Sequence, residues 1–170
     1  MTHYDSPAPT MPEPSPEAKD IFMVHYPGSA GVLASDVFAN AKFEHGELTI
    51  EVAPEGIVGM CEQAKADGYN FLEDVTAVDW YPTEPRFQIS YSILSMGMKK
   101  RLRVITRLHG DSPNIDSITS VWPSANFYER EVFDLFGVRF AGHPRLTRIM
   151  MPDNWNGHPL RKDYPVEGYR

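Results

Sequence analysis

The chain has 170 residues, a formal net charge of −7 and a single cysteine, Cys61. This length suits one domain with appendages and allows a core of its own. One cysteine excludes an internal disulfide and an Fe–S cluster held by this chain alone, and we interpret Cys61 as a small core residue in a reducing compartment. The sequence contains no apolar run of about 18 residues and no secretory leader pattern, so we expect no direct transmembrane span.

The charge is unevenly distributed along the chain. Residues 139–170 contain six Lys or Arg and three Asp or Glu and carry a net charge of +3, whereas residues 1–138 carry −10. A basic tail on an acidic body favours an acidic protein partner. We expect no nucleic acid partner, because the basic residues are few and are separated by prolines.

The first half of the chain predicts a tail, two helices and a strand. Residues 1–20 contain five of the fifteen prolines and are predicted to be a disordered tail. A helix is predicted over 28–41. Alternating apolar residues predict a half-buried strand over 48–52. A second helix is predicted over 54–68, because Pro54 suits a first helical position and Gly68 suits the position after the last.

The middle of the chain predicts three consecutive strands. They span 71–78, 87–93 and 102–108, and the last two form a β-hairpin. The last of these strands carries three arginines on its solvent face, Arg101, Arg103 and Arg107. We interpret them as keeping that exposed face soluble. A short helix over 115–121 follows. This element order predicts an α+β domain over 21–141, with a mostly antiparallel four-stranded sheet and helices packed on one face.

The last predicted helix follows the Trp122-Pro123 pair. Asn126 and Glu129, three residues apart, predict a capping box at its start. Arg130 and Asp134 are spaced for an ion pair on one helix face, and Gly137 suits the position just after the helix. An apolar stripe on another face is formed by Tyr128, Val132, Leu135 and Phe136.

Residues 142–170 predict an extended, irregular C-terminal interaction arm. Prolines recur at 144, 152, 159 and 165, too often for a long helix or a central strand. The segment has too few apolar residues for a core of its own, yet it is rich in Trp, Tyr and Arg, the residue types of interaction hot spots. We therefore expect an arm ordered mainly by a partner. A tail packed only on its own domain is the alternative.

Two histidines raise the alternative of a metal enzyme or hydrolase. His143 and His158, with Asp153 and Asp163, could be assembled into a ligand set. Their spacing matches no compact metal motif, and each histidine precedes a proline, which favours turn-stabilising roles. No Gly-rich nucleotide loop or nucleophile elbow is present. We expect no catalytic, cofactor-binding or metal-binding residue in this chain. A general adaptor domain, whose tail binds an unrelated protein, is a further alternative.

Two long stretches resemble the signatures of the thirty-kilodalton subunit family of respiratory complex I. They are EREVFDLFG at 129–137, leading to HPRLTRIM at 143–150, and DNWNGHPLRKDYP at 153–165. The resemblance implies a non-catalytic, cofactor-free subunit in the hydrophilic arm of a proton-translocating NADH–quinone oxidoreductase, with FMN and Fe–S clusters in partner subunits. It also implies a peripheral position on the cytoplasmic face of the bacterial inner membrane. Chloroplast and cyanobacterial homologues and membrane-bound hydrogenase subunits share this domain.

The resemblance also implies the partners and the residues that contact them. The C-terminal arm is expected to dock on the forty-nine-kilodalton-type subunit that forms the quinone pocket (the D subunit). Further contacts are expected with the Fe–S subunits of the twenty-three-kilodalton and twenty-kilodalton types. Arg161 and Lys162 are expected to form charge-assisted hydrogen bonds with the partner. The complete set of expected interface and signature residues is Glu129, Arg130, Glu131, Asp134, His143, Arg145, Arg148, Asp153, Trp155, Gly157, His158, Arg161, Lys162, Asp163 and Tyr164.

Overall fold

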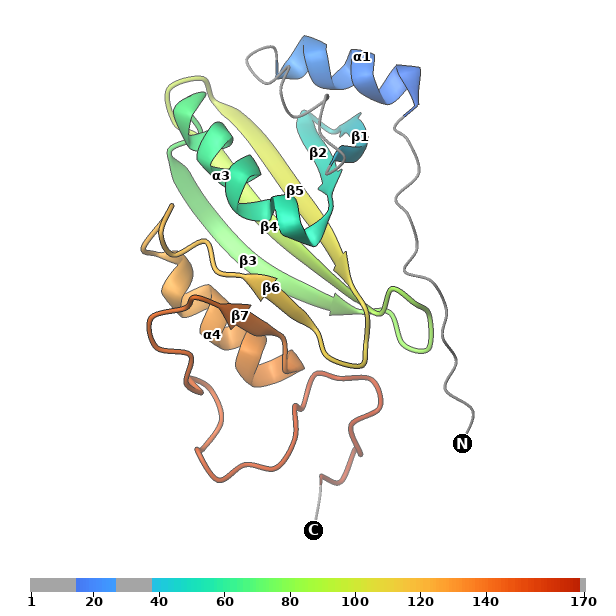
Figure 1. Cartoon of the computed structure of the whole chain (residues 1–170), viewed down its shortest axis with the longest axis vertical. Helices are drawn as coiled ribbons and strands as arrows, with labels where there is room; N and C mark the ends of the chain where they lie inside the picture. Colours follow the sequence, from blue (N-terminus) through green and yellow to red (C-terminus); the bar gives the residue numbers. More distant parts are fainter. Residues whose placement is uncertain (1–14, 27–37, 169–170) are drawn as a thin grey trace.

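A five-stranded sheet forms the centre of the molecule in the computed structural model, which describes residues 15–26 and 38–168. Its strand order is β1-β2-β5-β4-β3 (Figure 1). The strands are β1 (Phe38–Glu44), β2 (Glu47–Val52), β3 (Phe71–Asp79), β4 (Phe87–Ser95) and β5 (Lys100–Leu108). All neighbours are antiparallel except β2 and β5, which are parallel. The α+β class and the mostly antiparallel sheet are confirmed, but the predicted number of four strands is wrong.

The additional strand is β1, and it corrects the helix predicted over 28–41. Residues 38–41 are extended and pair with β2, and the remainder of that predicted helix lies outside the described residues. His45 and Gly46 both have positive φ, 52° and 79°, which is the backbone of a tight hairpin turn. Because this turn folds the preceding segment back onto β2, the ladder of hydrogen bonds overrides the helical spacing of the apolar residues.

A helix also replaces part of the predicted N-terminal tail. Helix α1 spans Pro16–His25, so residues 16–20 are helical; residues 1–14 lie outside the described part of the chain. The hydroxyl of Ser15 accepts a hydrogen bond from the Ala18 N–H at 3.1 Å, and Pro16 occupies the first helical turn. Phe22 is fully buried and joins the core, which attaches α1 to the sheet.

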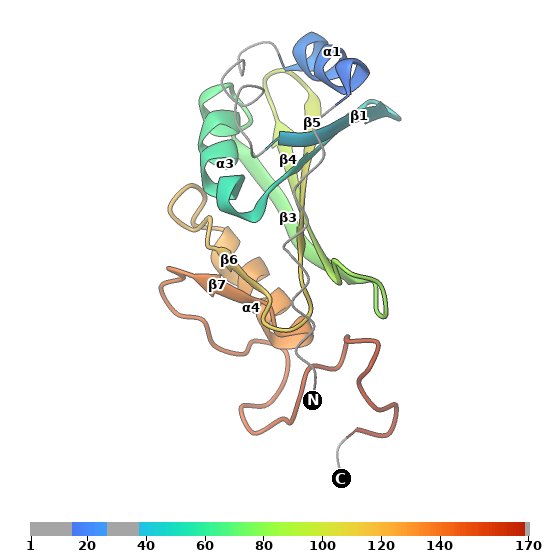
Figure 2. The same cartoon turned by 45° about the vertical axis from the view of Figure 1, so that its right-hand side comes forward.

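Two helices cover one face of the sheet. The predicted helix at 54–68 is present as a short 3-10 turn, η1 (Pro54–Gly56), that continues into α3 (Ile57–Ala66). Helix α4 (Ala125–Phe136) lies beside β3 on the same side (Figure 2). The core lies between the helices and the sheet, and it includes Cys61, which is fully buried. In the described residues, no helix is long and apolar enough to cross a bilayer.

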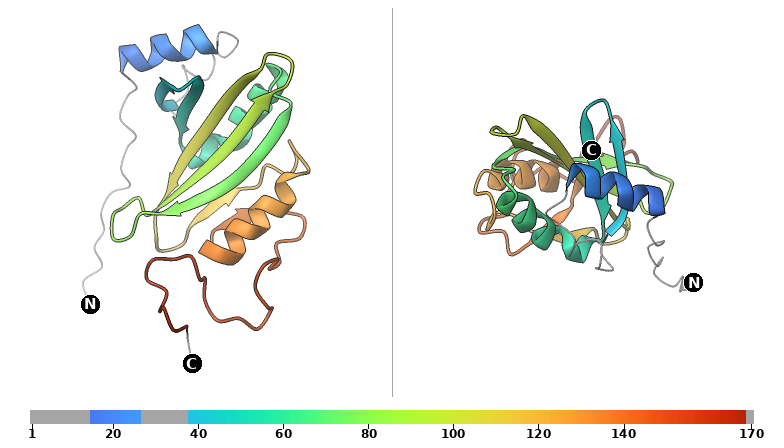
Figure 3. Two further views of the ribbon diagram at one scale, coloured as in Figure 1. Left: turned by 180° about the vertical axis from the view of Figure 1, so that it is seen from behind. Right: turned by 90° about the horizontal axis from the view of Figure 1, so that it is seen from above.

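No helix of the described residues lies over the other face of β3, β4 and β5, as seen from behind in Figure 3. The three arginines of β5 lie on this face and form ion pairs with glutamates of other strands. Arg103 pairs with Glu47 at 2.6 Å and Arg107 with Glu51 at 2.8 Å, both on the neighbouring strand β2, and Arg101 pairs with Glu73 of β3 at 3.3 Å. This agrees with their interpretation as a solvated strand face.

A second, small sheet replaces the short helix predicted over 115–121. Strands β6 (Asn114–Asp116) and β7 (Arg139–Ala141) are parallel neighbours, and Ile115 is opposite Phe140. The physical reason is tertiary, because the partner strand comes after α4 and is distant from β6 in the sequence. Pairing buries both of these apolar side chains. Residues 118–122 form a tight turn instead of a helix.

Candidate functional site

The candidate site is the arm, residues 142–168, together with helix α4, which it follows and contacts. The arm contains no helix or strand and runs around the end of α4 (Figure 1). The last four carbonyl groups of α4, those of residues 133–136, all accept hydrogen bonds. The donors, in order, are the Gly137 N–H, the His158 ring, the Leu160 N–H and the Arg161 guanidinium. Helix ends normally leave these carbonyls without intrahelical partners. The arm supplies the last three of the four donors, so it acts as an extended C-cap of α4.

Gly137 is the residue that permits this close approach. Its φ is +76°, in the left-handed region, and it occupies the cap position predicted from the sequence. A Cβ added at Gly137 would lie 2.6 Å from the guanidinium of Arg161 and 2.6 Å from the ring of His158. Any side chain here would displace the groups that cap the helix.

Asp134 holds the middle of the arm. Its carboxylate is fully buried, and one oxygen accepts three successive N–H groups, from Ile149, Met150 and Met151, at 3.0, 2.8 and 2.8 Å. The other oxygen accepts the guanidinium of Arg148. Burial raises the pKa of Asp134, but the three N–H groups and Arg148 outweigh it, and the net pKa is lowered. The carboxylate is therefore an ionised anchor for the arm.

The ion pair predicted between Arg130 and Asp134 is therefore wrong. The guanidinium of Arg130 donates instead to the carbonyls of Thr147 and Arg148, both at 3.0 Å. The four donors to the buried carboxylate of Asp134 form a stronger set than a solvent-exposed pair along one helix face could provide. Arg148 also donates to the carbonyl of Gly157 at 3.0 Å, so it ties two parts of the arm together.

Glu129 also has a different role from the predicted capping box. Helix α4 begins two residues earlier than expected, with Ser124 as N-cap and without a side-chain cap. The fully buried carboxylate of Glu129 accepts the Ser117 hydroxyl at 2.6 Å and the Ile118 N–H at 2.8 Å. Burial raises the pKa of Glu129 to about 7, although these hydrogen bonds oppose the rise. The carboxylate of Glu129, which is among the expected interface residues, is therefore turned into its own domain.

The two histidines lie at opposite ends of α4. His143 accepts the Arg145 N–H on Nδ1 at 3.0 Å and donates from Nε2 to the carbonyl of Asn126 at 3.3 Å. His158 donates from Nδ1 to the carbonyl of Asp134 at 2.9 Å. Burial lowers the pKa of both rings, so both are neutral supports of the arm. Across residues 15–26 and 38–168, no group of three His, Cys, Asp or Glu side chains is placed to hold a metal ion.

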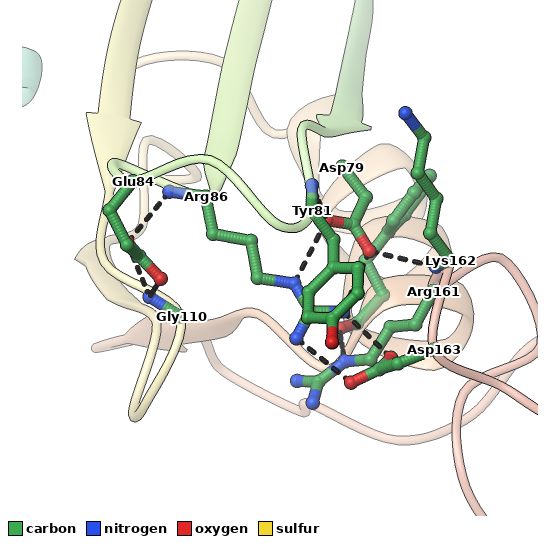
Figure 4. Close-up of polar contacts among 9 residues, drawn as sticks. Asp79, Tyr81, Glu84, Arg86, Gly110, Arg161, Lys162 and Asp163 are labelled. Carbon is green, nitrogen blue, oxygen red and sulfur yellow. Dashed lines mark hydrogen bonds and ion pairs between the residues drawn. The ribbon is translucent and has the colours of Figure 1, made fainter.

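A buried ion-pair cluster, here called the Arg86 clamp, joins the sheet to the end of the arm (Figure 4). Arg86 precedes β4 and is 7% exposed. Its guanidinium donates twice to Asp79, at 2.9 and 2.8 Å, and twice to Asp163, at 2.9 and 2.7 Å. Asp79 also accepts the Lys162 N–H at 2.8 Å. Burial would raise the pKa of Asp79, but Arg86 and the backbone donors lower it to about 2.

Sequence reasoning missed Arg86 and Asp79. The available signal was a charged pair flanking the proline-marked loop between two strands, with Asp79 at the end of β3 and Arg86 immediately before β4. Nothing in the local spacing connects them with Asp163, which is 77 residues away from Arg86 in the chain.

The sequence of residues 50–170 matches the family model described as the 30 kDa subunit of respiratory-chain NADH dehydrogenase. This chain belongs to that family. Curated relatives named as the C subunit of NADH-quinone oxidoreductase include that of Citrifermentans bemidjiense, 45% identical over 82% of this chain and 89% of its own. That of Geobacter sulfurreducens is 49% identical over 72% and 77%.

Solved structures share the fold of this family member. A chain described as Nqo5, in a trypsin-resistant fragment (1-134), matches with a TM-score of 0.62 and 30% identity, over 74% of this chain and 98% of that one. A chain from an archaeal membrane-bound sulfane sulfur reductase matches with a TM-score of 0.69 over 88% and 85%. At 23% identity, the second likeness concerns the fold alone.

The expected interface residues of this family member divide into two groups. Residues turned toward the protein's own domain are Glu129, Arg130, Asp134, His143, Arg148, Gly157, His158, Arg161 and Asp163. Tyr164 is half-buried and donates to the carbonyl of Asn156. Residues exposed on the outside are Glu131, Arg145, Asp153, Trp155 and Lys162. Most of the signature therefore builds the arm, and the smaller group is accessible to a partner.

Proposed function

We propose that this chain is a cofactor-free structural subunit of the peripheral arm of a proton-translocating NADH–quinone oxidoreductase. Family membership supports the assignment to this enzyme. The non-catalytic role is supported by the contacts of the titratable side chains in the arm and on α4. Asp134, His143, His158 and Asp163 each hold the arm against its own domain. Electron transfer would then depend on FMN and Fe–S clusters in partner subunits, and this chain would hold its neighbours in place.

The two-sided construction of the arm is the observation that carries a docking role. Its inner side is occupied by α4 and the Arg86 clamp, whereas its outer side leaves large apolar side chains exposed. Met150 is 63% exposed, Leu160 51% and Trp155 40%. Apolar side chains that stay exposed on a segment held by hydrogen bonds and ion pairs favour contact with another protein. Trp is also enriched among the hot-spot residues of protein interfaces.

A hollow at the end of the arm adds a shape suited to a partner side chain. It has a volume of about 400 Å³ and is lined by Trp155, Pro159, Tyr164, Pro165, Val166, Glu167 and Gly168. Rigid aromatic and proline walls cost little conformational entropy on binding. We propose that the forty-nine-kilodalton-type quinone-pocket subunit (the D subunit) fills it. The Fe–S subunits of the twenty-three-kilodalton and twenty-kilodalton types would lie nearby, on the cytoplasmic face of the membrane.

The test is native purification of the tagged chain from membranes, followed by mass spectrometry of the co-purified subunits. The proposal expects the peripheral-arm subunits at equal stoichiometry. Trp155→Ala should weaken assembly by roughly 2–4 kcal/mol if the ring contacts the partner. Trp80→Ala is the matched control, because Trp80 is similarly exposed, at 45%, and lies outside the arm. Equal losses in both variants would contradict a specific docking role for Trp155.

The basic side chains of the arm allow a second test of docking. Lys162→Glu is cleaner than reversing Arg161 and Lys162 together, because Arg161 also caps α4. In the described part of the chain the Lys162 side chain forms no hydrogen bond or ion pair, and only its backbone N–H is used. We expect Lys162→Glu to weaken assembly while leaving the fold intact. Unchanged assembly would exclude this charge as a docking determinant.

The scaffold role makes a distinct prediction for enzyme turnover. NADH-to-quinone activity, divided by the amount of assembled complex, should stay near normal in His143→Ala and His158→Ala. NADH oxidation with an artificial acceptor serves as the reference for the upstream steps. A variant that assembles fully but has lost turnover would indicate a direct proton or metal role for that histidine and would contradict the scaffold proposal.

A further inference from the structure

We infer that Arg86 is a positioning residue for docking, which fixes the end of the arm before a partner binds. This inference rests on the proposed function, because it concerns the same arm and its partner. Arg86 lies outside the signature stretches and far from the arm in sequence, yet its guanidinium is the link between the sheet and Asp163. The segment that it holds includes Lys162 and leads directly into the hollow lined by Tyr164 and Pro165.

The geometry of the clamp is rigid on the sheet side. Arg86 and Asp79 are 7% and 3% exposed, and both hydrogen bonds between them are shorter than 3.0 Å. The guanidinium also lies 4.9 Å from the ring centroid of Tyr81 and 4.9 Å from that of Phe87. A planar guanidinium held by a carboxylate and two rings has little freedom left to lose.

The loop that carries Arg86 is itself fixed. The Arg86 N–H donates to the carboxylate of Glu84 at 2.9 Å, and the same carboxylate accepts the Gly110 N–H at 3.2 Å (Figure 4). A Cβ at Gly110 would lie 2.7 Å from a Glu84 carboxylate oxygen and 2.8 Å from Cδ of Arg86. The remaining donors of Arg86 therefore point in one direction, and Asp163 is bound there in a bidentate arrangement.

The arm side of the clamp carries Lys162, whose exposed side chain a partner can reach. The Lys162 N–H is bound by Asp79, while its side chain extends away from the cluster (Figure 4). The guanidinium of Arg161 lies 5.2 Å from the ring centroid of Phe87 and caps α4. Ordering these residues in advance removes an entropic cost that the partner contacts would otherwise have to offset.

The clamp can be broken from the arm side with little risk to the fold. Asp163→Asn removes the charge of an aspartate whose side chain is 43% exposed and leaves the Arg86–Asp79 pair intact. Asp153→Asn is the matched control, because it makes the same change at an exposed position of the same arm. Arg86→Gln breaks the clamp from the sheet side, and the Arg86→Gln, Asp163→Asn double variant tests whether both act through one contact.

Two measurements on the full chain together decide the inference. Amide exchange of residues 161–168 should be about 10-fold or more faster in Asp163→Asn than in the wild type, with residues 147–151 unchanged, because Asp134 holds them. The dissociation constant for peripheral-arm particles prepared without this subunit should rise about 10-fold, as the partner must then order the segment. Asp153→Asn should change neither quantity, and the double variant should behave like Arg86→Gln.

The other outcomes overturn the inference. Weaker binding with unchanged exchange would mean that Asp163 contacts the partner directly. Faster exchange with unchanged binding would mean that the clamp has no part in docking. Losses that add in the double variant would show that Arg86 and Asp163 act separately. If the wild type itself does not bind the particles, the proposed function fails, whereas the exchange measurement still reports on the clamp.

Discussion

The sheet domain and the arm are held by different forces. The domain buries a continuous set of apolar side chains, including Phe87, Ile89 and Leu102, which are all fully buried. Within the described part of the arm, Leu146 is the apolar residue that packs on this core. The arm depends otherwise on hydrogen bonds to the carbonyls of α4, to Asp134 and to Arg86. Apolar burial is shared across a whole core, whereas each hydrogen bond is local and directional.

This difference implies that the two regions should lose order in different ways. A net hydrogen bond contributes only about 0.5–1.5 kcal/mol, or about 1.5–3 kcal/mol when one partner is charged. The arm should therefore open locally at one anchor without unfolding the sheet. In the isolated chain, amides after Gly142 should exchange faster than in the assembled complex, but with slow positions where Asp134 and Asp79 accept N–H groups.

The largest expected effect is the loss of a core side chain. Leu102→Ala should lower the free energy of unfolding by about 2–5 kcal/mol, because it creates a cavity in the sheet core. Leu160→Ala is the matched control in the arm, since Leu160 is 51% exposed, and it should change stability by less than about 0.5 kcal/mol. Urea unfolding of both variants measures the difference. Similar losses would contradict the contrast between core and arm.

The next effect concerns the anchor at Asp134. Asp134→Asn removes the negative charge and leaves the Arg148 guanidinium without its carboxylate, which should cost about 3 kcal/mol. The loss should appear as faster amide exchange at residues 147–151, with the midpoint of sheet unfolding changed much less. Glu131→Gln, at an exposed position of the same helix, is the control. Unfolding of the sheet together with the arm would show that the two regions form one cooperative unit.

Glu129 connects the two regions, since it lies on α4 but is buried in the domain, and it predicts a pH dependence. Its folded-state pKa is about 7, above the ordinary value of 4.5. The folded state therefore binds the proton of Glu129 more tightly than the unfolded state does. The stability that this protonation contributes is complete below about pH 4.5 and is lost as the pH rises to about 7. At roughly 1.4 kcal/mol per pKa unit, the loss is on the order of 3–4 kcal/mol.

Glu129→Gln tests this dependence without removing the hydrogen bonds. The glutamine carbonyl can accept the Ile118 N–H, and its amide can donate to the Ser117 hydroxyl. The variant should be more stable than the wild type at pH 8 and similar to it at pH 4.5, as measured by urea unfolding across this range. His143 lies 4.0 Å from Glu129, and its lowered pKa acts in the opposite direction. A difference in stability between Glu129→Gln and the wild type that does not change with pH would contradict the raised pKa of Glu129.

The backbone of this fold was predictable where the local pattern and the tertiary structure agree. The alternation in 87–93 and 102–108 correctly predicted the β4–β5 hairpin, because one face of that hairpin is buried and the other is open. Gly137 was correctly predicted as a helix cap, because a positive φ has a strong local preference. The helix predicted over 28–41 failed at residues 38–41, because pairing with β2 provides hydrogen bonds that local spacing does not reveal.

The contacts of the site could not be predicted in the same way. Glu129 and Asp134 were assigned partners three and four residues away, whereas their actual partners are Ser117, Ile118 and the backbone of residues 149–151. Buried carboxylates bind the donors that the folded chain brings to them, and these donors come from separate segments. The resemblance singled out stretches between residues 129 and 165, but it did not indicate which of their residues face the domain.

The smallest expected effect is at Arg107, which provides the comparison for Arg86. Arg107 lies in β5, and Arg86 directly precedes the neighbouring strand β4. Each binds a carboxylate at 2.8 Å, but the Arg107 side chain is 36% exposed and that of Arg86 is 9% exposed. Arg107→Gln should lower the free energy of unfolding by no more than about 1 kcal/mol, since exposed ion pairs are screened by water and salt. The same change at Arg86 leaves Asp79 buried without its guanidinium, so it should cost several times more.

Urea unfolding at low salt and at 1 M NaCl measures the loss of stability in both variants. The Arg107 effect should shrink with salt and the Arg86 effect should persist, and equal, salt-sensitive losses would mean that burial does not distinguish the two pairs.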